Sequence, residues 1–227
     1  MLSSWGVSFE GVDVEAAPAA RADLARLEIP GVPAVVVGDR AVHGWNPRDV
    51  AELVGVPYIE PARLSPGELA RQLDRILAAA QGVIRQVPSE HLAMTTPGRD
   101  RSVRQLAYHV FRLSVAYRDA VLARRLPKAW LDEPAPPELA DGAAIATYGD
   151  RVRTELARWL GQPEACAGVV DTYYGMQTAH ELLERTVWHA AQHLRQLHVM
   201  LDRMGIVPEA PLSAIDLEGL PLPKELW

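Results

Sequence analysis

The sequence has one cysteine, and this shortage excludes two kinds of stabilisation. Cys166 stands alone among 227 residues, so the chain forms no internal disulfide and no zinc site built from several thiolates. Any metal would be held mainly by nitrogen and oxygen atoms. A single thiol suits a reducing compartment, and we therefore expect a cytoplasmic protein.

Basic residues and long apolar runs are also scarce. Lysine and arginine total 23 against 29 aspartate and glutamate residues, a formal net charge of -6, and basic residues occur only in short pairs such as Arg124-Arg125. We therefore expect no nucleic-acid partner. No run of about 18 apolar residues occurs, and no basic region precedes an apolar block at the N-terminus, so we expect neither a membrane span nor a signal peptide.

What is present is ordinary globular composition, with 48% hydrophobic and 23% charged residues, divided by a proline-flanked segment at residues 57–61. Prolines at both ends of this segment disfavour regular structure beside them. We predict an α+β chain made of a small α/β module over residues 1–56, a linker over 57–64, an up-down four-helix bundle over 65–205, and a tail over 206–227 that packs on the bundle.

The first module is predicted to contain two helices and three strands. Asn46 and Pro47 are typical of a helix start, and Gly38-Asp39 is typical of a hairpin turn. The predicted order is a strand over 7–14, a helix over 17–27, strands over 34–38 and 41–45, and a helix over 47–54.

Four stretches of this module resemble the C-terminal two-thirds of a glutaredoxin, namely residues 2–10, 12–15, 32–38 (VPAVVVG) and 42–45 (VHGW). In that family the proline after the valine is cis and its backbone pairs with the cysteinyl part of glutathione, while backbone amides at the next helix start hold the γ-glutamyl carboxylate. The resemblance assigns these thiol-binding positions to Val32, Pro33, Trp45 and Asn46. The alternative is a small α/β scaffold without a ligand.

The chain departs from the glutaredoxin pattern at its start. The family's first strand and its Cys-x-x-Cys motif would precede Met1, so this module cannot perform dithiol chemistry. In the family that strand lies between the second strand and the hairpin, and we expect the sheet to close the gap or to borrow a neighbouring strand. Leu2 onward resembles the end of a helix, which suggests that Met1 is a late start assignment.

The second module is predicted to be four amphipathic helices without strands between them. Ser65 and Glu68 form a capping-box pattern before the first helix, and Gly205 and Pro208 follow the last. The predicted helices span residues 66–86, 103–125, 138–160 and 178–203, and Cys166 is expected in a loop.

Three histidines occupy apolar stripes of these helices. His189 and His193 are four residues apart and therefore share a helix face, and His109 falls on the stripe of the second helix. A buried imidazole needs partners for its nitrogens, although a hydrogen-bonded core histidine is commoner than a metal ligand. Three neutral imidazoles with an open fourth position are typical of a catalytic metal site. Zinc or nickel is favoured, and iron or manganese would also fit.

Residues 103–111 (VRQLAYHVF) and 188–197 (WHAAQHLRQL) resemble the DinB-like superfamily of metal-binding helix bundles. Its members carry one metal-binding histidine on the second helix and a His-x-x-x-His pair on the fourth, which His109, His189 and His193 match. Some members activate a low-molecular-weight thiol such as mycothiol, bacillithiol or glutathione. The four other histidines, His43, His91, His180 and His198, are left out of the predicted site, and His43 and His91 are expected in solvent.

Three hypotheses follow for function. The first is a metal-dependent enzyme that uses a small-molecule thiol for S-transfer to an electrophilic substrate or for isomerisation. The second is a non-catalytic metal-binding or stress-related protein that forms a homodimer and uses its N-terminal module as an interaction surface. The third is a purely structural bundle. Arg185 and Arg195 flank the histidine pair and are candidates to receive an acidic part of thiol or substrate, although a solvent-facing charge is the commoner role.

Overall fold

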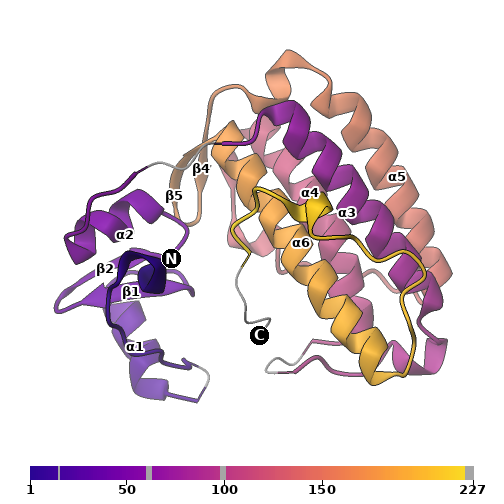
Figure 1. Cartoon of the computed structure of the whole chain (residues 1–227), viewed down its shortest axis with the longest axis horizontal. Coiled ribbons are helices and arrows are strands. Elements are labelled where there is room, and N and C mark those ends of the chain that lie inside the picture. Colours follow the sequence, from indigo (N-terminus) through magenta and orange to yellow (C-terminus); the bar gives the residue numbers. More distant parts are fainter. Residues whose placement is uncertain (15, 60–62, 98–100, 223–227) are drawn as a thin grey trace. The chain divides into compact units, whose positions relative to one another are not determined.

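The computed structural model describes residues 1–14, 16–59, 63–97 and 101–222, and the chain divides into two compact units, residues 1–62 and 63–227. The first unit begins with a short 3-10 turn at Leu2–Trp5 (Figure 1). Its regular elements are α1 (Pro18–Arg26), β1 (Ala34–Val37), β2 (Arg40–His43) and α2 (Pro47–Val54).

The hairpin and the helix that follows it form as predicted. β1 and β2 pair antiparallel, with Val37 opposite Arg40, so Gly38 and Asp39 make the two-residue turn. Gly38 adopts a φ of 65°, which glycine tolerates without steric cost. Asn46 is the N-cap residue of α2. The Val32-Pro33 peptide bond is cis, as the glutaredoxin resemblance implied.

The strand predicted over residues 7–14 is wrong, because this segment is irregular. An extended segment is stable only when its N–H and C=O groups pair with a neighbouring strand, and within the described residues no strand pairs with residues 7–14. Within the described part of residues 1–62 the sheet has only β1 and β2. A sheet that closes the predicted gap is not formed by these residues, pairing with a strand from a neighbour stays a prediction, and a glutaredoxin-like fold is not shown.

The second unit is a four-helix bundle formed by α3 (Pro66–Gln86), α4 (Val103–Ala123), α5 (Gly142–Leu160) and α6 (Ala179–Arg203) (Figure 1). Side chains from all four helices fill one core, among them Leu69, Ile76, Phe111, Ile145, Leu182 and Leu194. Capping boxes fix the starts of α3 and α6, because Ser65 pairs with Glu68 and Thr178 pairs with Glu181.

The order of the helices differs from a simple up-down bundle. α3 packs against α5 and α6, and α4 packs against the same two helices, so the consecutive pair α3 and α4 lies on a diagonal. The connections over residues 87–102 and 161–178 are long enough to cross the end of the bundle, whereas short loops would have made consecutive helices neighbours.

A small sheet replaces part of the predicted loops. β3 (Arg125–Leu126) pairs with β4 (Val169–Thr172), which forms a hairpin with β5 (Gly175–Thr178). The prediction of no strand between the helices is therefore wrong, because strands of two and four residues are too short to show a clear period. The helix predicted to reach residue 125 ends at Ala123, and the helix predicted from residue 138 begins at Gly142, where Asp141 caps it.

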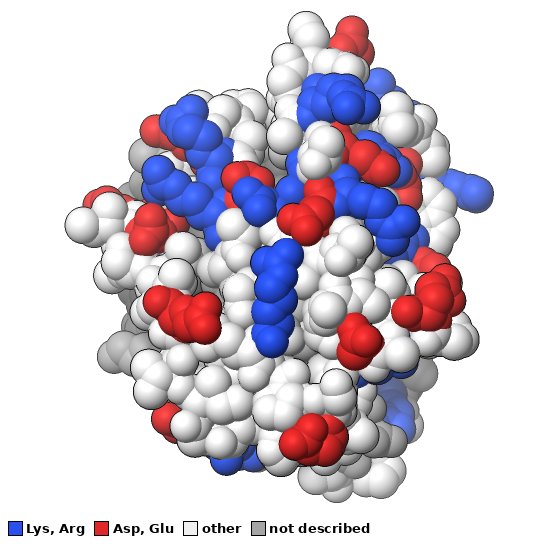
Figure 2. Space-filling model, turned by 90° about the vertical axis from the view of Figure 1, so that its right-hand side faces the viewer, with Lys and Arg blue, Asp and Glu red and all other residues white. Residues whose placement is uncertain are grey.

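Buried and exposed polar groups join α3 to α5. The Gln81 amide, only 1% exposed, donates to Ala146 O and to Asp150 Oδ1, both at 2.7 Å, and its oxygen accepts from Arg153 Nη1 at 2.9 Å. Arg153 also makes a two-pronged ion pair with Asp74. Figure 2 shows one face of the molecule, on which basic and acidic side chains lie next to one another.

Replacing Gln81 with leucine is expected to destabilise the bundle by about 1–3 kcal/mol, because the volume is kept while three hydrogen bonds are lost inside the core. Gln86→Leu is the matched control, since the Gln86 amide only bonds back to Gly82 O on its own helix. Urea unfolding followed by far-ultraviolet circular dichroism measures both variants. Equal effects of the two substitutions would contradict a special role for Gln81.

The described part of the tail packs on the bundle. The Gln72 amide donates to Glu218 O at 2.7 Å, Arg75 pairs with Asp216 at 3.2 Å, and Trp188 Nε1 donates to Pro221 O at 3.0 Å. The last five residues of the predicted tail, 223–227, lie outside the described residues. Within the part of the chain that the structure describes, no helix combines the length and the apolar character that crossing a membrane requires.

Candidate metal centre

Three histidines from two helices meet inside the bundle. His109 comes from α4, and His189 and His193 come from successive turns of α6. One ring nitrogen of each lies within 4.8 Å of one ring nitrogen of the other two. Their ring centroids are 4.5–5.5 Å apart. His109 and His193 are buried, at 4% and 5% exposure, whereas His189 is partly exposed.

The cluster fits a divalent metal ion by its donor set. Nitrogen ligands at about 2.0–2.1 Å from a tetrahedral zinc ion lie about 3.3 Å from one another, so small side-chain movements would bring the three imidazoles into range. Such ligands must be neutral. Although the residue as a whole is partly exposed, the His189 ring lies in the interior, and its burial lowers the pKa well below the usual value; the nearby His193, His109, Arg185 and Arg101 lower it further. This imidazole is therefore neutral at pH 7.

Gln196 sets the tautomer of His193. The two side chains are one turn apart on α6, and the His193 Nδ1 to Gln196 Oε1 distance is 2.6 Å. An amide oxygen only accepts, so Nδ1 carries the proton and Nε2 presents its lone pair. This is the arrangement by which a residue behind a metal ligand usually orients the imidazole.

Replacing Gln196 with leucine is expected to weaken metal binding about 10–100-fold, because His193 loses the acceptor that fixes its ring and tautomer. Gln192→Leu is the matched control: Gln192 is equally buried at 8% on the same helix, and its oxygen accepts from Arg195 Nη1 at 2.9 Å. Competition for Zn²⁺ against a chromophoric chelator measures both affinities. An unchanged affinity in Gln196→Leu would show that the bond does not support the ligand.

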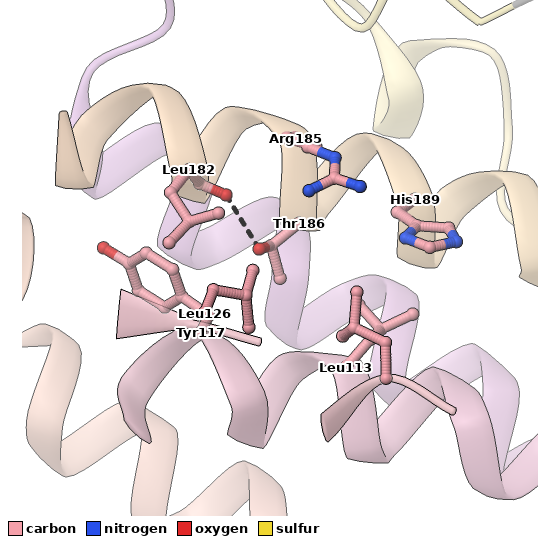
Figure 3. A pocket seen from close by; sticks show the side chains of 8 residues that line it. Leu113, Tyr117, Leu126, Leu182, Arg185, Thr186 and His189 are labelled. Atoms are coloured by element: carbon pink, nitrogen blue, oxygen red, sulfur yellow. Dashed lines mark hydrogen bonds between the residues drawn. The ribbon is translucent and has the colours of Figure 1, made fainter. Parts of the chain in front are cut away.

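Arg185 lies beside the histidine cluster. The commoner role of a charged helix residue, which is to face solvent, does not apply to it. It lines a small pocket with His189, one turn further along α6, and Thr186 (Figure 3). The other lining residues are mostly apolar: Leu113, Tyr117, Leu126, Leu131 and Leu182. The cavity holds about 10 Å³, room for about one water molecule.

Two tyrosines missed by the sequence analysis hold Arg185 in place. Its Nη2 donates to the Tyr173 hydroxyl at 2.7 Å, and its guanidinium carbon lies 3.9 Å from the centroid of the Tyr174 ring. Both tyrosines form the turn between β4 and β5. The four-residue spacing of Arg185 and His189 indicated a shared helix face, but nothing in the sequence indicated the tyrosines.

Cys166 and the remaining histidines do not belong to the three-histidine group among the described residues. Arg195 bonds Gln192, and the hydroxyl of Tyr117 lies 3.6 Å from the Cys166 sulfur. His180 Nε2 lies 2.9 Å from Leu64 O. His43 is 4% exposed, so its predicted placement in solvent is wrong, because it closes the buried end of β2. His91 and His198 are partly buried and belong to no metal-ligating group in the described residues.

The four predicted thiol-binding residues share one end of the β1–β2 hairpin. Ala34 pairs with His43, and Gly44 N donates to Pro33 O at 2.8 Å, which sets Val32 and Pro33 next to the segment that carries Trp45 and Asn46. Trp45 N donates to His43 Nδ1 at 3.3 Å. Their role in binding a thiol stays a prediction.

Comparison with known proteins gives only distant likenesses, all among solved structures. No family model matches the chain, and no curated protein matches it. Among solved structures, YfiT from Bacillus subtilis, described as "a probable metal-dependent hydrolase with an unusual four-helix bundle topology", is 17% identical. The match has a TM-score of 0.45 and covers 67% of this chain and 96% of that chain. A likeness this distant decides neither ligand nor reaction.

Proposed function

We propose that the protein is a metal-dependent enzyme of the DinB-like type that holds a divalent ion, zinc or nickel in preference to iron or manganese, with His109, His189 and His193. The observation that carries this proposal is the convergence of three imidazoles, each offering a nitrogen within 4.8 Å of the others, in the interior of the bundle. Three protein ligands leave a coordination position open for a reactant.

The second part of the proposal is that the reactant is a low-molecular-weight thiol, which reacts with an electrophile by S-transfer or assists an isomerisation. A divalent ion bound by neutral imidazoles is a Lewis acid that lowers the pKa of a thiol or water in its open position. The chain's only cysteine is placed near Tyr117 and is not a member of the histidine group. The nucleophile therefore comes from outside, and the DinB-like resemblance of residues 103–111 and 188–197 favours a thiol.

In this proposal each group of residues around the site has its own role. His109, His189 and His193 hold the ion, and Gln196 keeps the proton of His193 on the nitrogen that faces away from it. Leucines from α4, α6 and the β3 region make the inner side of the site largely apolar and leave room for about one water molecule. No carboxylate belongs to the histidine group in the described residues, so the ion's charge is left for an anionic reactant.

Calorimetric titration tests the thiol. Protein loaded with Zn²⁺ and the same protein stripped by a chelator are each titrated with mycothiol, bacillithiol and glutathione, with S-methylglutathione as the blocked control. We expect one of the three thiols to bind the loaded protein alone and the blocked thioether not to bind. If the loaded protein binds none of the three thiols, the proposal of a thiol reactant is contradicted and water is left as the nucleophile.

The alternative is a non-catalytic metal-binding protein whose N-terminal module is an interaction surface. It is favoured by the apolar side chains that residues 1–62 expose, including Phe9, Val12, Val36 and Val37, which are 43–58% exposed. This alternative expects a homodimer, and sedimentation equilibrium measures it. The double variant Phe9→Ser with Val36→Ser should dissociate that dimer, and a monomeric wild type would contradict the alternative.

A further inference from the structure

The surroundings of the histidine cluster carry positive charge. Arg185 lines the same pocket as His189. A cationic side chain thus lies beside three imidazoles whose group, among the described residues, contains no aspartate or glutamate.

This charge distribution is unfavourable for a metal alone. A guanidinium repels a dication at short range, and the low dielectric of a buried site strengthens that repulsion. Arginine beside a cation is favourable when an anion lies between them and interacts with both.

Arg185 is also held more firmly than a solvent-facing arginine. Tyr174, 5% exposed, stacks under its guanidinium at 3.9 Å, and the Tyr173 hydroxyl accepts from Nη2 at 2.7 Å. Contacts to two rings of one β-turn remove most of the rotamer freedom that a long side chain would lose on binding a ligand. The guanidinium is therefore pre-organised on the wall that it shares with His189 (Figure 3).

We infer that Arg185 and the ion of the histidine cluster together bind the carboxylate of a small-molecule reactant. This inference rests on the proposed metal site and adds the chemical class of the ligand. A carboxylate is planar and singly charged, which suits one arginine and one open metal position, whereas phosphate would call for more donors. The cavity behind Arg185 has room for about one water-sized group, so the body of the reactant extends outward from the carboxylate.

Co²⁺ loaded into the full-length protein supplies a visible spectrum that reports ligands at the metal without any assay of activity. Titration with acetate is expected to change this spectrum in the wild type, while the neutral isostere acetamide leaves it unchanged. Arg185→Gln is expected to weaken acetate binding about tenfold or more, and Arg185→Lys less than that. Arg203→Gln, which removes an exposed arginine from the end of the same helix, should bind acetate as the wild type does.

Tyr173→Phe provides a second variant should Arg185→Gln fail to fold. It keeps the ring and the arginine, removes only the hydrogen bond to Nη2, and is expected to weaken acetate binding about threefold or more. Undiminished acetate binding in Arg185→Gln, or in Tyr173→Phe where the first variant is unfolded, would overturn the inference. If inorganic phosphate binds more tightly than acetate and this binding depends on Arg185, the assignment of a carboxylate as the ligand is overturned. A wild type without a Co²⁺ spectrum would refute the metal site itself.

Discussion

Replacing His109 with alanine is expected to abolish metal binding. The wild-type protein should hold about one ion per chain, and His109→Ala close to none, because two imidazoles from one helix leave the ion without the ligand that closes the site from α4. Elemental analysis of protein purified in parallel gives the stoichiometry. His193→Ala should lose the metal as well, since both residues are buried and belong to the same proposed site.

Metal-dependent stability gives a second measure of the same loss. A ligand that binds only the folded state stabilises it by RT ln(1 + [L]/Kd), about 2.7 kcal/mol at a hundredfold excess over Kd. That increment should vanish in His109→Ala, whatever the substitution does to the metal-free protein. His198→Ala is the control, because His198 lies on α6 but outside the cluster and should leave both metal content and increment unchanged. Equal metal content in His109→Ala and His198→Ala would refute the site.

The sequence was informative where polar residues interrupt the apolar stripe of a helix. Polar residues at 109, 189 and 193 interrupt apolar stripes that the structure buries, and helix geometry alone put the second and third on one face. Their meeting with His109 could be expected because facing helices of a bundle share one core. Capping signals at Ser65 and Asn46 placed helix starts correctly, since the requirements of a cap are local.

The sequence was uninformative where structure depends on distant partners. Residues 7–14 carry a strand pattern, but a strand exists only when a neighbouring strand pairs with it, and the pattern alone does not reveal that no described strand does so. The β4–β5 turn is positioned by pairing with β3, over 40 residues away in the sequence. For that reason neither Tyr173 nor its contact with Arg185 could be foreseen, and the charged side of the metal site emerged only from the fold.

Alanine at Gly142 is expected to cost the bundle about 3 kcal/mol. Gly142 is the first residue of α5, and a Cβ there would lie 2.2 Å from the carbonyl oxygen of Ile84 on α3. A backbone oxygen near the end of a helix cannot rotate away as a side chain can, so the two helices must move apart. Overpacking of this kind typically costs about 1–3 kcal/mol, and a clash with backbone belongs at the upper end. Urea unfolding followed by the helical circular dichroism signal measures the loss.

Gly82→Ala supplies the matched control from the opposite helix. Gly82 lies inside α3, and a Cβ there would meet nothing within 4 Å, so only the helix propensity changes. Alanine is favoured over glycine by about 1 kcal/mol in a helix interior, and this variant should therefore be slightly more stable than the wild type. The two substitutions are chemically identical and are predicted to have opposite signs. A Gly142→Ala protein as stable as Gly82→Ala would mean that α3 and α5 do not approach as closely as Ile84 and Gly142 indicate, and that the α3–α5 side of the bundle packs differently.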